Sequence, residues 1–245
     1  MPEWITGRNP VYEVMRAGRR KIFGLHTAKG VQQKGRIIEI LTLAEKHNIP
    51  VSQVPRTDLD RISSGHQGVA LSVGEYPNSS LVEMLDLAEE RRQPPFLLIL
   101  DTLQDPQNLG ALLRTAEVVG VHGVLLPLRQ TATVTPTVVN VSSGASEHLL
   151  IEQTNLAQAI AALKENDVWV IGLDGSDDAK PPEEVRLDGA IALVVGSEGR
   201  GMRRLVRDSC DMLLRLPMRG QIGSLNAAVA GSVGLYLASG ARGWE

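Results

Sequence analysis

Several features that define large protein classes are missing from this sequence. Cys210 is the only cysteine among the 245 residues, so no disulfide can form within the chain. The longest apolar runs, such as residues 96–100, are the length of a strand and fall short of the roughly 18 residues that a membrane helix requires. The opening residues MPEWITGRNP lack the apolar segment of a secretory signal. These absences lead us to expect a cytoplasmic protein.

The fingerprints of metal sites and of common nucleotide sites are absent too. The five histidines are scattered and no Cys/His spacing is typical of a metal site, so we expect no metal. A G-x-G-x-x-G run after an early strand and the phosphate-binding G-x-x-x-x-G-K-[ST] are both missing. The G-x-S-x-G elbow of α/β-hydrolases is missing as well. A plain nucleotide-binding α/β enzyme is therefore disfavoured.

The chain contains instead an alternation of helices and strands in two blocks. Residues 1–75 have the pattern of a small α/β domain. A change of composition predicts a linker over residues 76–95, which includes one helix-like stretch. Over residues 96–245, continuous apolar strands alternate with helices, which is typical of a parallel sheet covered on both faces.

Basic residues are concentrated at one end of a chain whose formal net charge is −3. Residues 1–36 carry a formal charge of +6, which leaves −9 for the remainder. A basic end on an acidic chain is typical of a protein that meets a polyanion such as RNA. A solvated helix face would give the same charge pattern.

Three loops follow predicted strands of the second block, where a doubly covered sheet binds its ligands. They begin after residues 101, 196 and 217, and they are rich in glycine, asparagine, serine and charge. Each loop alone is also explained by ordinary turns and helix caps. Polar groups that converge from three loops on one crevice instead predict an active site.

Five polar side chains of these loops are candidates for chemistry. Asn108 and Arg114 flank the start of a helix, which Asn108 can cap. Arg114 is the only charge among apolar neighbours, and Glu198 in the glycine turn is its candidate partner. Ser224 and Asn226 open the last helix, and Ser224 is well suited to be its N-cap.

These residues carry a family resemblance. The segments DPQNLGALLRTAEVVGVHGVLL, LVVGSEGRGM and LPMRGQIGSLNAAVA resemble the three signature motifs of the SpoU family of RNA ribose 2′-O-methyltransferases, part of the SPOUT superfamily. They stand in the family's order and span most of residues 101–230. Residues 1–75 resemble the substrate-binding domain of one branch, and TGRNPVYEVM stands where that branch has its opening motif. The chain looks most like the 23S rRNA guanosine 2′-O-methyltransferases.

The resemblance implies a fold and a methyl donor. The fold would be α/β, with a trefoil-knotted parallel-sheet methyltransferase domain over residues 96–245 preceded by a small L30e-like α/β domain over residues 1–75. S-adenosylmethionine would bind in a bent shape against the knot, where the glycines of the second motif let backbone approach it closely. The cofactor-binding residues would be Gly196, Gly199, Gly201, Leu216 and Leu225.

Methyl transfer to a ribose 2′-hydroxyl requires alignment with the donor and a more nucleophilic oxygen. The resemblance places Arg114 beside that hydroxyl, where we expect a cation that stabilises the developing alkoxide or grips the adjacent phosphate. Arginine is effectively always protonated, which argues against a role as general base. The other catalytic candidates would orient Arg114 and the ribose, or in the case of Ser224 only cap a helix: Asn108, Glu198, Asn226 and Ser224.

The first block is expected to select RNA without catalysing. Its first helix would begin with Asn9 as N-cap and Pro10 at the first helical position, where free N–H groups favour phosphate. His66 has a polar, glycine-flanked setting that suits an RNA contact or a simple loop role. The RNA-binding candidates are Arg8, Asn9, Arg16, Arg19, Arg20 and His66.

The expected partners are RNA, 23S rRNA above all, and a second copy of the chain; no membrane partner is expected. The last helix is rich in alanine, glycine and serine, a composition that needs packing against another element. A homodimer through this C-terminal helix region would provide it, and burial within the chain is the alternative. Two other functions stay open: a SpoU enzyme that acts on tRNA, and a non-catalytic RNA-binding relative.

Overall fold

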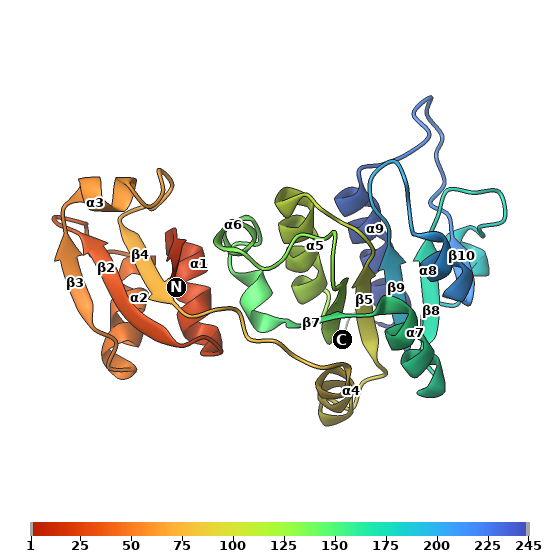
Figure 1. Ribbon diagram of the computed structural model, residues 1–245, viewed down its shortest axis with the longest axis horizontal. Coiled ribbons are helices and arrows are strands. Elements are labelled where there is room, and N and C mark those ends of the chain that lie inside the picture. The colour runs from red at the N-terminus through yellow and green to blue at the C-terminus, as the bar shows by residue number, and fades with distance from the viewer. Residues whose placement is uncertain (1, 244–245) are drawn as a thin grey trace. The chain divides into compact units, whose positions relative to one another are not determined.

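The structure, a computed structural model, describes residues 2–243, which separate into two compact units (Figure 1). Unit 1 holds residues 2–77 together with residues 133–148, and unit 2 holds the remaining described residues. Each unit has its own β-sheet. The division differs from the expected ranges, because a segment of the second sequence block belongs to unit 1.

Unit 1 contains a four-stranded mixed sheet in the order β1-β4-β2-β3. The strand β4 pairs antiparallel with β1 and β2, whereas β2 and β3 run parallel. Helices α1 and α2 bury apolar residues at helical spacing, which explains their place on the sheet. The elements are β1 (Glu3–Thr6), α1 (Arg8–Ala17), β2 (Ile22–Ala28), α2 (Arg36–Lys46), β3 (Val51–Val54), α3 (Arg56–Asp60) and β4 (Val69–Val73).

A buried ion cluster ties residues 133–148 to the rest of unit 1. The guanidinium of Arg20 donates to Glu147 at 2.9 Å and to Glu3 at 2.8 Å, and the arginine side chain is fully buried. Removing one partner of such a pair typically costs about 3–5 kcal/mol, because the other charge is left buried and unpaired. Residues 133–148 form α6 (Pro136–Val141) and the 3-10 helix η1 (Ala145–His148).

Tyr76 lies against the same cluster. Its hydroxyl donates to the carbonyl of Ser146 at 2.9 Å and accepts from Arg19 at 3.0 Å. Burial raises the pKa of Tyr76 to about 12, so its phenol is neutral in the folded protein at pH 7. Arg19 and Arg20 are thus engaged within unit 1, so only part of the basic N-terminal charge faces solvent.

Unit 2 contains six parallel strands in the order β10-β8-β9-β5-β6-β7. The strands β5, β6 and β9 are buried at every position, as their continuous apolar sequences predict. The strands are β5 (Phe96–Leu100), β6 (Gly123–Pro127), β7 (Leu150–Thr154), β8 (Trp169–Leu173), β9 (Ile191–Val195) and β10 (Met212–Leu214). The helices are α4 (Leu81–Glu90), α5 (Pro106–Val118), α7 (Leu156–Glu165), the 3-10 helix η2 (Pro182–Glu184), α8 (Arg204–Ser209) and α9 (Ala227–Ala241).

The stretch expected as a linker contains a capped helix that belongs to unit 2. The Ser80 side chain accepts from the Glu83 backbone N–H at 3.3 Å, and Glu83 accepts from the Ser80 N–H at 2.7 Å, which is a capping box. Met84 on α4 is fully buried in the core of unit 2, against Gly123, where a Cβ would overlap its side chain. Residues 81–90 are therefore part of the folded unit.

His122 is a buried histidine beside the start of β5. Its Nδ1 accepts from the Phe96 N–H at 3.0 Å, and its Nε2 lies 3.1 Å from Gln93 Oε1. Burial, together with the charges of Arg91 and Arg242, lowers the pKa of His122 from 6.5 to about 4. The neutral ring is therefore the form that the fold holds at pH 7.

We expect the free energy of unfolding to fall as the pH drops from 6.5 towards 4. In this range the unfolded chain binds a proton on His122 and the folded chain does not, so stability is lost at up to roughly 1.4 kcal/mol per pH unit. Urea denaturation at several pH values measures the loss. The slope should shrink in His122→Gln and persist in His47→Gln, whose side chain is exposed. An equal slope in both variants would contradict the assignment.

Candidate functional site

Three loops at one edge of the unit 2 sheet hold the candidate site. The strands β5 and β9 are parallel neighbours, so the loops after Leu100 and Val195 emerge side by side. The loop after β5 leads into α5, the loop after β9 contains Glu198, and the chain after β10 leads into α9. Because all six strands are parallel, the three carboxyl ends share one edge, as the sequence predicts.

Three side chains, one from each loop, form a closed ring of hydrogen bonds. The Asn108 amide Nδ2 donates to Glu198 Oε1 at 2.9 Å, and Asn226 Nδ2 donates to Asn108 Oδ1 at 3.0 Å. Asn226 Nδ2 also donates to Glu198 Oε1. Both amides donate to Oε1, and no described residue donates to Glu198 Oε2. This second oxygen can therefore accept a hydrogen bond from a ligand.

The glycines of the second motif shape the turn that presents Glu198. Ser197 and Gly201 exchange two backbone hydrogen bonds of 3.0 Å, and Gly199 and Gly201 adopt φ values of +76° and +66°. A Cβ on Gly196 would overlap the backbone of Gly201. Glycine is thus required because the loop folds tightly on itself. The close approach of backbone to the cofactor that the sequence suggested stays a prediction.

The ring lies where two cavities adjoin. The β10 cavity, of about 910 Å³, is lined by the loops after β8, β9 and β10. The β5 cavity, of about 680 Å³, is lined by the loops after β5, β6 and β9. Ser197, Glu198 and Gly201 line both cavities, whereas Asn108 faces the β5 cavity and Asn226 the β10 cavity. The Glu198 carboxylate therefore stands on the shared wall.

The β10 cavity gathers most of the residues that the sequence nominated. All five expected cofactor residues line it, together with three of the five catalytic candidates. The cofactor residues are Gly196, Gly199, Gly201, Leu216 and Leu225, and the catalytic candidates are Glu198, Ser224 and Asn226. Cavities of about 300–1,000 Å³ are typical for small ligands.

Arg114 lies elsewhere. It is exposed on α5 and lines neither cavity, and Glu198 pairs with Asn108 and Asn226 where the sequence suggested Arg114. The reason is the helix period: six residues after Asn108, the α5 surface has turned to another side. Within one chain, the site is therefore built from two amides and a carboxylate.

Three expected helix caps are corrected by the structure. The N-cap of α5 is Asp105, whose side chain accepts from Gln107 N–H at 2.9 Å, and Asn108 lies one turn inside. The N-cap of α9 is Asn226, with Ser224 outside the helix. In α1, Gly7 takes the N-cap position that Asn9 was expected to hold. Asn108 is thereby free to point its amide at Glu198.

A buried aspartate that the sequence analysis missed secures the glycine turn. Asp101 is fully buried at the end of β5 and accepts from the Arg203 backbone N–H and from Arg203 Nε, both at 2.7 Å. Arg203 directly follows the second motif, so this pair fixes where the turn ends. The sequence does contain a signal for this role, because Asp101 is an acidic residue directly after a wholly apolar strand.

A second missed pair borders the β10 cavity. Arg207 on α8 reaches Asp174 at 3.2 Å and Asp178 at 2.8 Å in the loop after β8. Burial raises the pKa of Asp174, but hydrogen bonds from Ser176 and Arg207 outweigh it and hold the pKa below its usual range. Asp174 therefore presents a carboxylate to the cavity that it lines.

The RNA-binding candidates of unit 1 fall into two groups. Arg20 is buried in its ion pairs, and His66 is buried with Nδ1 accepting from Gly68 N–H at 2.8 Å and Nε2 3.0 Å from Asp60. Both have structural roles, so the expected RNA contacts of these two residues are corrected. Asn9 and Arg16 are exposed, and Arg8 and Arg19 are partly exposed.

Over residues 2–243 there is no cluster of three or more His, Cys, Asp or Glu that could hold a metal ion. Over the same residues, no helix is both long and apolar enough to span a membrane.

Comparisons with known proteins agree with this architecture. Residues 95–236 match the SpoU rRNA Methylase family, and residues 4–79 match the RNA 2′-O ribose methyltransferase substrate binding family. A putative TrmH family tRNA/rRNA methyltransferase, YacO of Bacillus subtilis, is 42% identical over 96% of this chain and 94% of its own length.

Two solved structures are similar in fold. The SpoU methyltransferase AviRb from Streptomyces viridochromogenes, in complex with AdoMet, superposes with a TM-score of 0.82 at 20% identity, covering 98% of this chain and 90% of its own. An AdoMet-bound rRNA methyltransferase from Sinorhizobium meliloti gives a TM-score of 0.76 at 20% identity, covering 97% and 86%. The expected α/β fold with a parallel sheet and a preceding substrate-binding domain is confirmed, and the chain belongs to the SpoU rRNA methylase family of RNA methyltransferases.

Proposed function

We propose that this protein transfers a methyl group from S-adenosylmethionine to a ribose 2′-hydroxyl of RNA. The observation that carries the proposal is the Asn108–Glu198–Asn226 ring on the wall between two cavities. A group-transfer site needs a donor and an acceptor on either side of the reacting atoms. The β10 cavity suits the donor, and the β5 cavity suits the nucleotide that is methylated.

The residues of the β10 cavity fit S-adenosylmethionine. Leu173, Leu216 and Ala230 supply apolar surface for an adenine ring. Two carboxylates line the same cavity: that of Asp174 suits the ribose hydroxyls of the donor, and that of Glu198 suits its sulfonium charge. When bound, S-adenosylmethionine supplies an electrophilic methyl group.

The polar ring then has a direct task in the chemistry. Glu198 Oε2 would accept a hydrogen bond from the 2′-hydroxyl and so raise the electron density on its oxygen. Asn108 and Asn226 hold the carboxylate in place through Oε1, and Asn226 is itself fixed because its Oδ1 accepts from Ala228 N–H at 2.9 Å. As the new O–C bond forms, the bond between the methyl group and the donor sulfur would break, leaving S-adenosylhomocysteine, and the hydroxyl proton would pass to Glu198 or water.

The substrate class is the finer part of the proposal. We propose a guanosine of 23S rRNA, methylated in the cytoplasm, and this rests on the family branch that the N-terminal block resembles. Relatives named tRNA/rRNA methyltransferases make a tRNA target the second candidate. Mapping ribose 2′-O-methylation on rRNA and tRNA from cells with and without the gene distinguishes them. If both RNAs keep all their ribose methyl groups in cells without the gene, the proposed function is contradicted.

We expect one S-adenosylhomocysteine to bind per chain, in EDTA as well as without it, because the site consists of protein groups alone. Isothermal titration calorimetry measures the stoichiometry. Leu216→Asp should abolish binding, since it puts a charge on the apolar wall of the β10 cavity. The matched control is Leu205→Asp, at an exposed position outside that cavity. Binding that required an added metal would contradict the proposal.

We also propose that the protein is a homodimer through the C-terminal helix region. On α9, four apolar residues at helical spacing are exposed: Val229, Val233, Tyr236 and Leu237. On the adjoining helix α5, Val118 and Arg114 are exposed, and Thr115 bonds to Ser232 of α9 at 2.9 Å. An apolar stripe of this kind is typical of an interface.

Light scattering at micromolar concentration should give twice the mass of the chain. Val233→Glu and Leu237→Glu together should produce monomers, because they bury charges in the proposed interface. The control, Val82→Glu, changes an exposed valine on α4 and should leave the dimer intact. A wild-type monomer would contradict the proposed interface.

A further inference from the structure

Unit 1 contains a basic cavity of its own, far in sequence from the SpoU motifs. Its volume is about 630 Å³, and it lies at the carboxyl ends of β2 and β3, beside the start of α1. Three cations line it, and no acidic residue does. The lining residues are Arg8, Ala28, Lys29, Gly30, Val31, Gln32, Arg56, Gln67 and Gly68. We name it the Arg8–Arg56 pocket.

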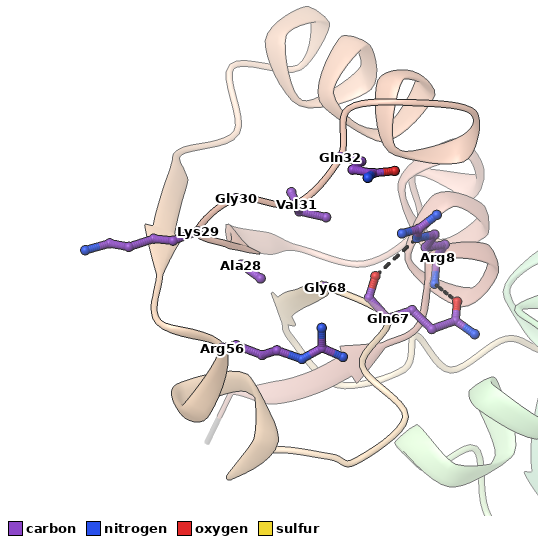
Figure 2. A pocket seen from close by; sticks show the side chains of 9 residues that line it. All are labelled: Arg8, Ala28, Lys29, Gly30, Val31, Gln32, Arg56, Gln67 and Gly68. Carbon is purple, nitrogen blue, oxygen red and sulfur yellow. Dashed lines mark hydrogen bonds between the residues drawn. The ribbon is translucent and has the colours of Figure 1, made fainter.

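Gln67 is the fixed point of this pocket. Its side-chain Oε1 accepts from the Arg8 N–H at 3.0 Å, and its carbonyl accepts from Arg8 Nε at 3.1 Å (Figure 2). Among the described residues, its amide Nε2 has no hydrogen-bond partner, so it is available as a donor. Because Arg8 Nε donates to this carbonyl, the guanidinium is held in one orientation. Among the described residues, its two terminal nitrogens have no hydrogen-bond partner and can donate to a ligand.

The backbone around Gln67 is held in an uncommon conformation. Gln67 has a φ of +50° and Gly68 a φ of +88°, and a side chain on Gly68 would overlap Val31. The buried His66 ring secures this turn, because Nδ1 accepts from the Gly68 N–H at 2.8 Å. A non-glycine residue in the left-handed region carries strain that is often found at binding sites. The turn is therefore a preformed part of the pocket wall.

Two arginines converge on this turn from different elements. In Figure 2, Arg56 extends from α3 towards Gln67 and Gly68, and Arg8 approaches Gln67 from α1, whereas Lys29 points away. Neighbouring acids do not neutralise them: Asp58 pairs with Arg61 at 3.2 Å, and Asp60 lies 3.0 Å from His66. Planar guanidinium groups bind phosphate through paired hydrogen bonds and also stack on bases.

We propose that the Arg8–Arg56 pocket binds one unpaired nucleotide of the RNA substrate. Arg8 and Arg56 would bind its phosphate groups, and the Gln67 amide would donate to the edge of the base. The amide of Gln32, at the same wall, offers a second donor and acceptor. A paired nucleotide hides its Watson–Crick edge, whereas an unpaired one offers both the edge and the phosphate to a concave site. This inference rests on the proposed RNA substrate and assigns unit 1 a defined contact with it.

The test uses the full-length protein and a fluorescein-labelled single-stranded RNA 12-mer of mixed sequence, with fluorescence anisotropy at several KCl concentrations. Arg8→Gln with Arg56→Gln should weaken binding on the order of 100-fold, since two charge-assisted contacts are lost. The slope of log affinity against log salt should become shallower by about 1.4, at roughly 0.7 for each phosphate contact. The charge-matched control, Lys21→Gln with Lys46→Gln, changes exposed residues outside the pocket and should alter neither the affinity nor the salt slope.

Gln67→Asn separates base recognition from charge. Asparagine tolerates a positive φ, so the turn is kept, but its shorter amide no longer reaches the base. Affinity should fall several-fold with no change in salt slope. Equal losses in the pocket variant and the control would overturn the proposal, as would a 12-base-pair RNA duplex binding as tightly as the single strand. Displacement of RNA by equimolar GMP or phosphate would show a free-nucleotide site and overturn it too.

The same variants distinguish this inference from the proposed function. S-adenosylhomocysteine binding is measured in unit 2 and should be unchanged by every substitution in the pocket. If the wild type methylates no ribose but RNA binding still depends on Arg8 and Arg56, the function proposal fails alone. If methylation proceeds and RNA binding ignores the two arginines, the pocket proposal fails alone.

Discussion

Glu198→Ala should lower the rate of methyl transfer about 10²–10³-fold while leaving the affinity for S-adenosylhomocysteine within about threefold. The substitution removes the only carboxylate in the ring and leaves two amide donors, Asn108 Nδ2 and Asn226 Nδ2, without their shared acceptor. S-adenosylhomocysteine carries no sulfonium charge, so its binding reports the cavity and not the charge. Single-turnover transfer of a labelled methyl group to RNA measures the rate.

Glu198→Gln refines the assignment. The glutamine Oε1 can still accept from both asparagines, so the ring survives, but the negative charge beside the hydroxyl is lost. The rate should fall less than in the alanine variant. Glu165→Ala, at an exposed position at the end of α7, is the matched control and should transfer at the wild-type rate. Full activity in Glu198→Ala would remove the ring from the mechanism.

Much of unit 2 could be predicted from the sequence because its signals are local. Continuous apolar strands such as residues 96–100 and 191–195 can only be buried on both faces, and their alternation with helices dictates a parallel sheet. Ligand loops then follow at the carboxyl ends. The knot is different: general chain-topology rules disfavour it, so it is a prediction that rests on the family resemblance.

Pairings distant in sequence escaped prediction. The strand β1 is four residues long and is defined by its antiparallel partner β4, about 65 residues later. Residues 133–148 join unit 1 through pairs distant in sequence, such as Arg20–Glu147 and Glu13–His148, which no local pattern announces. No local pattern distinguishes a buried arginine from a solvated one, which is why Arg20 was expected to meet RNA.

The candidate site illustrates the same limit at finer scale. Ser224 and Asn226 are equally suitable N-caps by residue type, and the choice depends on where Ala227 and Ala228 become buried. Residue types and motif order identified Asn108, Glu198 and Asn226, but they could not show that the three bond to one another. They also could not show that Arg114 lies outside the ring.

Arg114→Ala should reduce methyl transfer at least 100-fold without changing S-adenosylhomocysteine binding. The family resemblance assigns Arg114 to the substrate hydroxyl, yet this residue is exposed on α5 and lines neither cavity of its own chain. Its neighbour Thr115 bonds to Ser232 of α9, the helix whose exposed apolar stripe we propose as the dimer interface. Arg114 would therefore reach the site of the partner chain. Arg114→Lys should also fail, because a point charge does not replace a planar fork.

Mixed dimers test this arrangement. A dimer with Arg114→Ala in one chain and Glu198→Ala in the other is purified through two different affinity tags. If Arg114 serves the partner, one site has both defects and the other has none, so about half of the wild-type activity should return. If Arg114 serves its own chain, each site has one defect, and the mixed dimer stays as inactive as the two parent variants. Recovered activity would thus place Arg114 in the partner's site, and its absence would return Arg114 to its own chain.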